Sequence, residues 1–152
     1  MNKLHPDSVS KEGIDFIAEF EGLRLRPYLC PGGVWTIGDG HTHGVTKDTP
    51  PITEVEAVKL LVEDVRWVVK VIHNSVAVAL SKTQFDALAS FIFNVGAGAF
   101  YKSTLLKRLN DGDYVGAASE FYRWVNGGGE RLPGLIRRRA REVKLFRFGS
   151  YD

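Results

Sequence analysis

The segment from residue 21 to residue 43 gathers side chains that could act as acids, bases or metal ligands. It holds a glutamate, a cysteine, a threonine, an aspartate and two histidines, at Glu21, Cys30, Thr36, Asp39, His41 and His43. A catalytic zinc site uses three protein ligands and an open fourth position, which the cysteine and the two histidines could supply. However, the segment lacks the HExxH and CxxC spacings typical of zinc sites, and a histidine in a turn more often bonds to the backbone. The sequence therefore predicts no metal site.

Glu21 is the residue of this segment best suited to glycoside hydrolysis. Cleavage of a glycosidic bond needs a protonated carboxyl beside the leaving oxygen, and usually a second group across the sugar to activate water or stabilise the transition state. Glu21 lies near the end of a predicted helix and is followed by a glycine-rich stretch with further polar side chains. A single glutamate is usually only a surface residue, because unpaired carboxylates prefer water. Its spacing to the other residues therefore decides how it is interpreted.

That spacing resembles the signature of the phage-type lysozymes (endolysins) of glycoside hydrolase family 24. The signature is Glu, eight residues, Asp or Cys, five residues, Thr, and the stretch FEGLRLRPYLCPGGVWTIGDGHT contains it as Glu21, Cys30 and Thr36. The likeness continues through ALASFIFNVGAGAFYKSTLLKRLNDGDYVGAASEFYRWVNGGG and LPGLIRRRAREVKLF, so it covers nearly the whole chain. The resemblance implies a peptidoglycan hydrolase, a muramidase that cleaves the β-1,4 bond between N-acetylmuramic acid and N-acetylglucosamine without a cofactor.

The resemblance implies that Glu21 is the general acid. It also implies that Cys30 and Thr36 position the attacking water. An unperturbed cysteine is mostly protonated at neutral pH, so we expect the pair to hold the water rather than to deprotonate it. The chain departs from the family at Asp39, where an uncharged residue such as tyrosine is usual. Asp39 either bonds to its own backbone in a glycine-flanked turn or adds a carboxylate near the sugar.

The resemblance also implies residues that line the substrate cleft or support it. These are Gly40, His41, Phe93, Asn94 and Arg137. Among them His41 is expected to have a structural role near the hairpin. The family further has a basic residue that pairs with the catalytic glutamate, and here it is Arg137 or Arg138.

Local signals predict where the elements begin. Ser10 caps a helix that runs to about Arg24, and capping boxes begin helices at Thr53 and Ser81. Residues 27–45 alternate short β-prone runs with glycine turns, which predicts a small antiparallel sheet and the only strand-like region. A nearly all-apolar segment predicts a buried central helix, FDALASFIFNVG. Further helices are predicted over 103–110, over 114–125 and after Pro133.

The resemblance assembles these elements into an α+β, lysozyme-like fold, mostly helical with a small antiparallel β-hairpin lobe and a long inter-lobe helix. The chain is expected to form one domain over residues 1–152. The small lobe covers about 25–52, a helix over about 53–72 joins the lobes, and the helical lobe comprises 1–24 and 73–152.

Composition narrows the class of protein and its location. The 152 residues are 44% hydrophobic and 25% charged, which is ordinary for one globular domain, and the net charge of +2 is too small to indicate nucleic-acid binding. A single cysteine excludes an internal disulfide, and charges among the first twenty residues exclude the apolar core of a signal peptide or membrane anchor. We therefore expect a monomer that stays in the host cytoplasm until a holin-type protein releases it to the periplasm and cell wall.

Positive charge concentrates in the last predicted helix. Between Arg131 and Asp152, seven lysines and arginines stand against two acidic residues. A charge run is typical of a solvated helix face, and we expect this face to contact anionic envelope polymers. The residues predicted to face outward are Arg137, Arg138, Arg141 and Lys144.

Two other functions stay open at the level of the sequence. A lytic transglycosylase needs only an acid/base glutamate and closes the sugar into an anhydro product without water. A non-catalytic module that binds the wall or a polyanion would use the basic helix, and Glu21 would then have no chemical role.

Overall fold

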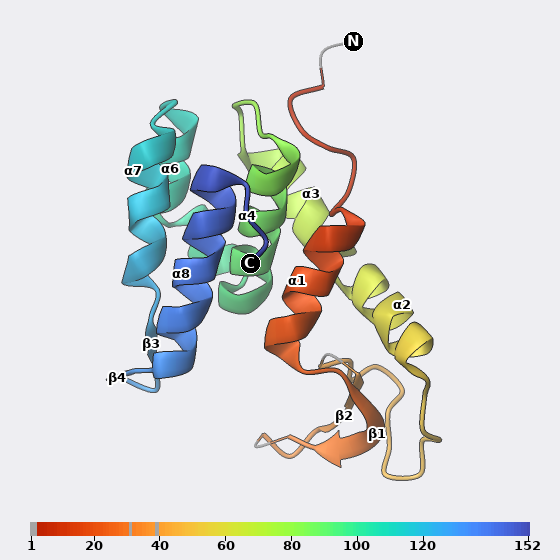
Figure 1. The fold of residues 1–152 in the computed structure, drawn as a ribbon. Helices are drawn as coiled ribbons and strands as arrows, with labels where there is room; N and C mark the ends of the chain where they lie inside the picture. The colour runs from red at the N-terminus through yellow and green to blue at the C-terminus, as the bar shows by residue number, and fades with distance from the viewer. Residues whose placement is uncertain (1–2, 31, 39) are drawn as a thin grey trace.

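The computed structural model describes residues 3–30, 32–38 and 40–152, which form a small β lobe and a larger helical lobe (Figure 1). The helices are α1 Lys11–Glu21, α2 Glu54–Asp64, α3 Arg66–Ser75, α4 Lys82–Val95, α5 Ala97–Tyr101, α6 Thr104–Asn110, α7 Tyr114–Glu120 and α8 Pro133–Phe148, with a 3₁₀ turn at Phe121–Arg123. The strands are β1 Arg24–Leu29, β2 Trp35–Gly38, β3 Asn126–Gly127 and β4 Glu130–Arg131. None of the helices within the described ranges has the length and apolar character needed to span a bilayer.

Helix α1 ends three residues earlier than the sequence predicts. Its N-terminus is capped by Ser10, as expected. At the other end Gly22 takes a left-handed conformation with φ of +65°, which stops the helix because only glycine adopts this conformation without steric cost. Glu21 is therefore the last helical residue, at the point where the chain passes from α1 into β1 (Figure 1).

Strands β1 and β2 form the predicted antiparallel hairpin. Their register places Tyr28 opposite Thr36, and the pairing is irregular between Arg24 and Tyr28. The turn that follows β1 is closed by a backbone hydrogen bond of 3.0 Å from the Cys30 N–H to the Val34 carbonyl. The hairpin thus brings Cys30 and Thr36, which are six positions apart in the sequence, to the same end of the sheet.

Two helices, α2 and α3, replace the single inter-lobe helix predicted over 53–72. The capping box at Thr53 begins α2 as expected, but a turn at Val65, with φ of −83° and ψ of −3°, separates α2 from α3. Helix α2 packs against α1 and the hairpin, whereas α3 packs against α4 and α5. The interruption at the buried Val65 lets each half follow its own lobe while keeping one apolar stripe on the core.

Helix α4 is the buried central helix that the sequence predicts. Residues 85–92 are all buried, and α1, α3, α5 and α8 pack around them (Figure 1). Two of the buried residues are polar, Asp86 and Ser90, and both accept or donate hydrogen bonds with side chains from distant parts of the sequence. The core of the helical lobe therefore contains polar links as well as apolar packing.

A second small hairpin, β3 and β4, lies outside residues 27–45, the only region in which the sequence predicts strands. Asn126 pairs with Arg131 and Gly127 with Glu130. The two residues of the turn have positive φ angles of 58° and 83°, which Gly128 and Gly129 adopt without strain. The run NGGG was thus the available signal for a hairpin.

The outward face of helix α8 differs from the prediction, because one of the arginines expected there is buried. Arg137 and Lys144 are exposed as expected, but Arg138 is only 5% exposed and Arg139 is completely buried. Their guanidinium groups lie over aromatic rings and are paired with carboxylates. The prediction failed because it assigned arginines to solvent, whereas buried arginines are stable when their charges are paired and their N–H groups bonded.

Candidate active site

Glu21 is fixed at the junction of the two lobes by an arginine of α8. The Arg138 Nη1 donates a hydrogen bond of 2.9 Å to the Glu21 Oε1, across 117 positions of sequence. The Glu21 side chain keeps 22% of its surface exposed, whereas that of Arg138 keeps 6%. The pairing left open by the sequence is thus made by Arg138, and Arg137 is exposed on the helix.

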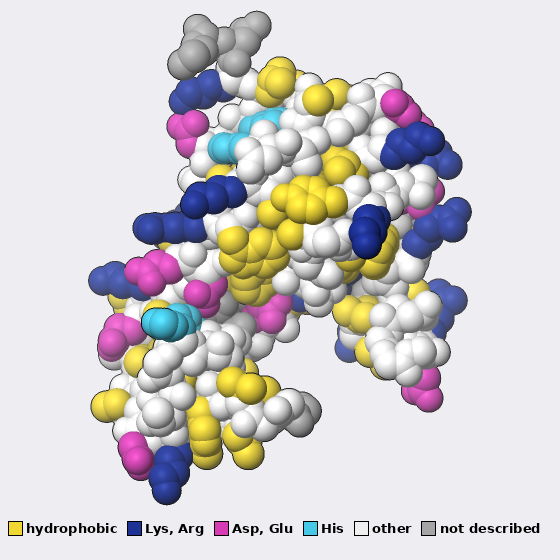
Figure 2. Space-filling model, turned by 180° about the vertical axis from the view of Figure 1, so that it is seen from behind, with side chains coloured by type: hydrophobic (Ala, Val, Ile, Leu, Met, Phe, Trp, Pro, Cys, Tyr) yellow, Lys and Arg dark blue, Asp and Glu magenta, His cyan; other side chains and the backbone are white. Residues whose placement is uncertain are grey.

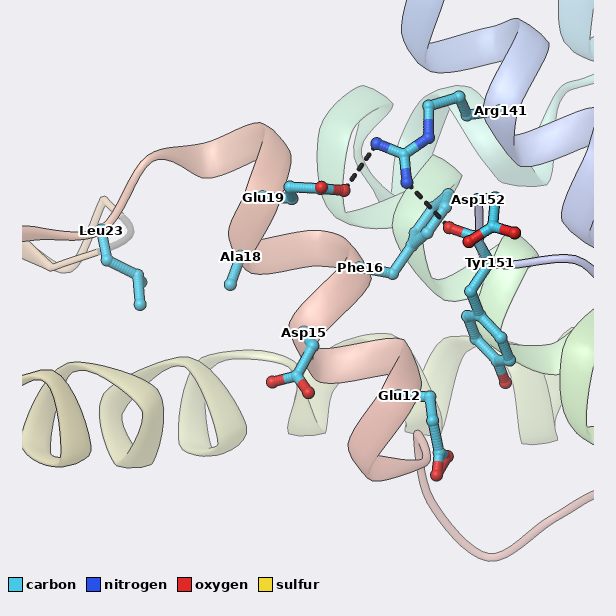
Figure 3. Close-up of a pocket in the computed structure, with 9 residues that line it drawn as sticks. All are labelled: Glu12, Asp15, Phe16, Ala18, Glu19, Leu23, Arg141, Tyr151 and Asp152. Atoms are coloured by element: carbon cyan, nitrogen blue, oxygen red, sulfur yellow. Dashed lines mark hydrogen bonds and ion pairs between the residues drawn. The ribbon is translucent and has the colours of Figure 1, made fainter.

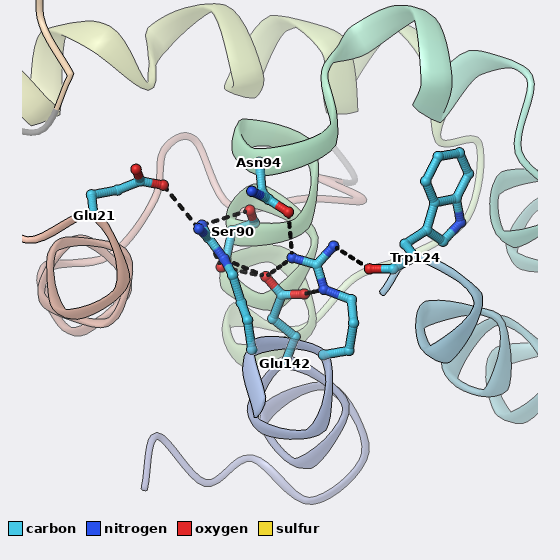
Figure 4. A network of polar contacts seen from close by, with 7 residues as sticks. Glu21, Ser90, Asn94, Trp124 and Glu142 are labelled. Carbon is cyan, nitrogen blue, oxygen red and sulfur yellow. Dashed lines mark hydrogen bonds and ion pairs between the residues drawn. The ribbon is translucent and has the colours of Figure 1, made fainter. Parts of the chain in front are cut away.

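The guanidinium group of Arg138 is held from behind by two further residues. Its Nε donates to the Glu142 Oε2 at 3.2 Å, and its Nη2 donates to the Ser90 carbonyl at 3.1 Å. A guanidinium is planar, so contacts at all three nitrogens fix both its position and its orientation. Figure 4 shows these contacts as a network that extends from Glu21 into the helical lobe.

The centre of this network of polar contacts is Glu142, which has no exposed surface. The Ser90 hydroxyl donates to its Oε2 at 2.5 Å, and the Arg139 Nε lies 2.7 Å from its Oε1 as an ion pair that lacks hydrogen-bond geometry. Burial raises the pKa of Glu142 and lowers the pKa of Arg139, against the attraction between the two groups. We expect both groups to be charged, because each compensates the other.

Asn94 joins the same network rather than standing alone in the cleft. Its Oδ1 accepts a hydrogen bond of 2.8 Å from the Arg139 Nη2, and the residue is exposed near the end of α4. In Figure 4 the Asn94 side chain lies between the helix and the buried polar groups. Asn94, which the resemblance places in the cleft, is therefore positioned by Arg139, a residue that is not among the predicted site residues.

Cys30 and Thr36 come together at the end of the hairpin. Thr36 is 3% exposed and its hydroxyl donates to the Val34 carbonyl at 3.0 Å. The pKa of the Cys30 thiol is lowered from its ordinary value, chiefly by the backbone N–H of Val34, next by that of Gly32, and to a smaller extent by the Thr36 hydroxyl. The turn thus stabilises a thiolate, which treating Cys30 as an unperturbed cysteine did not anticipate.

Gly40, His41 and Phe93 line one pocket between the lobes, with a volume of about 470 Å³. His41 is held by backbone bonds to Ile37, and its Nδ1 lies 3.2 Å from the Asp64 Oδ1 at the end of α2. These contacts fix the position of His41, and the structural role expected of it stays a prediction. Five further residues line this pocket and are not among the predicted site residues, namely Thr42, His43, Glu63, Asp64 and Trp67.

A signal for Trp67 was available in the helix pattern. Leu61, Val65, Val68 and Ile72 are spaced so that they form one apolar stripe along residues 53–72. Trp67 lies off this stripe, so its large ring could not belong to the core. It is 40% exposed in the structure.

A second and larger cavity, of about 860 Å³, contains none of the predicted site residues. It lies between α1 and the C-terminal residues (Figure 3), where Arg141 bonds to Glu19 at 2.5 Å and to the Tyr151 carbonyl at 2.8 Å. Asp39 falls outside the described residues. Within the described part of the chain, no three His, Cys, Asp or Glu side chains gather closely enough to hold a metal ion.

Comparison with known proteins identifies the family. The sequence model described as "Phage lysozyme" matches residues 18–142. An endolysin of Acyrthosiphon pisum secondary endosymbiont phage 1 is 45% identical over 142 residues, which cover 91% of this chain and 97% of that protein.

Two solved structures have the same fold. The muramidase domain of SpmX from Asticaccaulis excentricus aligns with a TM-score of 0.87 at 38% identity, over 93% of this chain and 99% of that chain. A mutant form of P22 lysozyme aligns with a TM-score of 0.85 at 38% identity, over 91% of this chain and 97% of that chain. The α+β, lysozyme-like fold predicted from the sequence is confirmed, and the chain belongs to the phage lysozyme family.

Proposed function

We propose that this lysozyme-type glycoside hydrolase is a muramidase that cleaves the β-1,4 bond between N-acetylmuramic acid and N-acetylglucosamine in peptidoglycan, with Glu21 as general acid. The observation that carries the proposal is the way in which Glu21 is held. Arg138 occupies only the Oε1 atom, and no described residue bonds to Oε2. One oxygen thus fixes the side chain, while the other is free to carry a proton to the bridging oxygen of the glycan.

Cys30 and Thr36 supply the second half of the reaction in this proposal. As the glycosidic oxygen takes the proton of Glu21, the bond to the muramic C1 breaks and a water adds its hydroxyl there. Thr36 can turn its hydroxyl from the Val34 carbonyl toward this water or toward the thiolate. The water's proton passes to Cys30 or to the solvent, and the lowered thiol pKa favours the first route.

The test is the Glu21→Gln variant, which keeps an oxygen for Arg138 but has no acidic proton. We expect lysis of chloroform-treated Gram-negative cells to fall by about 10²–10⁴-fold, the usual contribution of general-acid catalysis. Glu19→Gln is a matched control, because Glu19 is also on α1 and also pairs with an arginine of α8, but is exposed. Unchanged lysis by Glu21→Gln would refute the proposal.

Mass spectrometry of the released muropeptides checks the reaction type. Hydrolysis leaves a reducing muramic acid end with one added water, and we expect this product. An anhydro-muramoyl end would instead identify a lytic transglycosylase.

We further propose that the protein acts on the wall at lysis, as a monomer, after a separate membrane-permeabilising protein releases it, as the resemblance to endolysins implies. The exposed cations of α8 would speed its association with anionic envelope polymers. Because Arg138 is buried and bound to Glu21, it cannot serve this purpose, and the exposed set is Arg137, Lys144 and Arg147. Replacing these three with glutamine should weaken salt-sensitive binding to cell envelopes.

A further inference from the structure

Two histidines that the mechanism above does not use hold the segment preceding α1, residues 3–9, which we name the arm. The His5 Nε2 in the arm donates a hydrogen bond of 2.9 Å to the Val78 carbonyl, between α3 and α4. In return, the His73 Nε2 on α3 donates a hydrogen bond of 2.9 Å to the Pro6 carbonyl in the arm. The docking of the arm on the helical lobe therefore depends on two imidazole rings.

The two imidazole rings lie against each other. Their centroids are 5.5 Å apart and their planes 21° apart, and both rings lie beside the buried ring of Phe85. Figure 2 shows histidine side chains side by side on the surface of the helical lobe. His5 is half-buried, and His73 is exposed. Two groups that can each gain a positive charge near neutral pH thus share one contact.

Each ring can take up one further proton without losing its own hydrogen bond. A carbonyl oxygen only accepts, so each Nε2 carries a hydrogen, and each neutral ring has a bare Nδ1 that can be protonated. The charged ring still donates from its Nε2. The cost of protonation therefore comes from the other ring, because two positive charges 5.5 Å apart repel each other.

The surroundings of the rings offer no counter-charge. Among the salt bridges of the described residues the only histidine is His41, so neither ring of the pair has a carboxylate partner. The charged groups on the elements around the rings are Lys3 and Asp7 in the arm, Lys70 on α3, Lys82 and Asp86 on α4, and Glu12 on α1. The three acidic groups are already engaged, Asp7 by Lys3, Glu12 by Lys82, and Asp86 by Ser10 and Tyr151. Two protonated rings would therefore repel each other without compensation.

The direction of the pH effect follows from the environment of His5. Its pKa is lowered from the ordinary value, chiefly by burial, against the bond to the Val78 carbonyl, and further by the charge of His73. The ring is therefore protonated more easily when the arm is undocked. By linkage, such a histidine favours docking above its ordinary pKa of about 6.5 and opposes docking as the pH falls below that value. Acid therefore weakens the contact between the arm and the helical lobe.

We propose that the arm is a pH-dependent latch, docked while both rings are uncharged and released when both are protonated. Release uncovers apolar surface in two places. The ring of His5 leaves Phe85, and the arm withdraws Ser8 and Val9 from one wall of a groove of about 460 Å³. The other walls of this groove are mainly aliphatic residues of α1, α2 and α3. The helical lobe thus exposes in acid an apolar surface that it covers at neutral pH.

Hydrogen exchange at one amide tests the latch. The Leu80 N–H donates to the Leu4 carbonyl of the arm at 2.8 Å, so it is protected only while the arm is docked. The readout is its protection factor, the intrinsic exchange rate divided by the observed rate, which removes the ordinary pH dependence of exchange.

We expect the Leu80 protection factor to fall by about fourfold or more between pH 8 and pH 5. Two charges 5.5 Å apart disfavour the docked state by a factor of about four in bulk water and of roughly a hundred at an effective dielectric constant of about 20. The amide of Leu88, in the buried part of α4, should keep its protection over the same range.

The double variant His5→Gln, His73→Gln separates charge from hydrogen bonding. Glutamine carries an uncharged amide N–H that can reach the same carbonyls, so the arm should stay docked and the protection of Leu80 should no longer depend on pH. His43→Gln is the matched control, because His43 is an exposed histidine of the small lobe. This control should keep the pH dependence of the parent.

Several results would overturn the latch. One is a constant Leu80 protection factor in the parent, and another is an unchanged pH dependence in the double variant. An equal fall at Leu88 would show that acid destabilises the whole helical lobe instead of releasing the arm. If the double variant leaves Leu80 unprotected even at pH 8, the ring resonances of His5 and His73 in the parent decide. They should titrate where Leu80 loses protection, and titration without that loss refutes the latch.

The outcome does not depend on the catalytic proposal. Glu21 takes no part in the docking of the arm, so the Glu21→Gln protein should show the same pH dependence at Leu80 as the parent.

Discussion

Replacing Glu142 with glutamine would remove a negative charge that lies between the guanidinium groups of Arg138 and Arg139, where α8 packs against α4. Glu142 is fully buried, 3.2 Å from the Arg138 Nε and 2.7 Å from the Arg139 Nε. Glutamine has nearly the same volume and keeps an oxygen for the Ser90 hydroxyl. However, its amide nitrogen is a hydrogen-bond donor and would face the N–H donors of a guanidinium group, so no hydrogen bond could form there. The change is therefore electrostatic rather than steric.

The magnitude follows from the burial of the pair. Among the salt bridges of the described residues, Arg139 is paired with Glu142 alone, so its charge would lose its only compensation. Removing one partner of a buried ion pair costs about 3–5 kcal/mol, a large share of the roughly 5–15 kcal/mol that stabilises a typical domain. For a chain of this size, each kcal/mol lowers Tm by about 2–4 °C, so we expect a fall of about 6–20 °C.

Urea unfolding measures this loss directly. We expect the midpoint to fall while the slope m stays constant, because the unfolded state exposes the same surface. Glu130→Gln in β4 is the matched control, since Glu130 is exposed and its loss should cost less than about 0.5 kcal/mol. A loss below about 1 kcal/mol in Glu142→Gln would show that the two guanidinium charges do not depend on this carboxylate, and would refute the reasoning.

Three further predictions concern individual side chains. Arg138→Lys should reduce lysis about tenfold or more in turbidity assays, because one ammonium cannot hold Glu21 and the buried network together and loses at least one charged hydrogen bond of roughly 1.5–3 kcal/mol. Cys30→Ser should keep measurable lysis and Cys30→Asp should match or exceed the parent, and alkylation of the parent thiol should titrate below the pH of free cysteine because its pKa is lowered. Burial raises the pKa of Tyr151 to about 12, so its bond to Asp86 contributes stability that is present below pH 10 and is lost as the pH rises through 12. Tyr151→Phe should cost about 1 kcal/mol in urea unfolding at pH 7 and remove this alkaline limb.

Much of the fold could be predicted from short-range signals. The capping boxes at Thr53 and Ser81 begin helices where expected, because the hydrogen bonds that satisfy the first turn involve residues only three positions apart. The glycine turns located the first hairpin in the same way. These signals failed at Val65. The apolar stripe continues through this residue and predicts one helix, but α2 ends just before it and α3 begins just after it.

The candidate site was predicted unevenly for a related reason. The motif of Glu21, Cys30 and Thr36 could be found because family resemblance records a spacing in sequence. For the residues that position Glu21, the resemblance left a choice between Arg137 and Arg138 and gave no sign of Ser90 or Glu142, since Arg138 meets Glu21 across 117 positions and Ser90 meets Glu142 across 52. A local charge pattern does not distinguish an arginine that faces solvent from one that reaches such partners unless it is known which acidic residue is buried.

The choice between Arg137 and Arg138 nevertheless had a local answer once Glu142 is taken as buried. On an α-helix each residue advances by about 100°, so positions three and four apart share a face, whereas positions five apart diverge by about 140°. Arg138 is four residues before Glu142 and Arg139 is three before it, and both make the ion pairs that this geometry allows. Arg137 is five before it and lies exposed. Of the two candidates, only Arg138 shares a helix face with the buried Glu142, which binds its Nε and leaves its Nη1 for Glu21. In a basic helix, a carboxylate is therefore the residue to examine first when an arginine partner is sought.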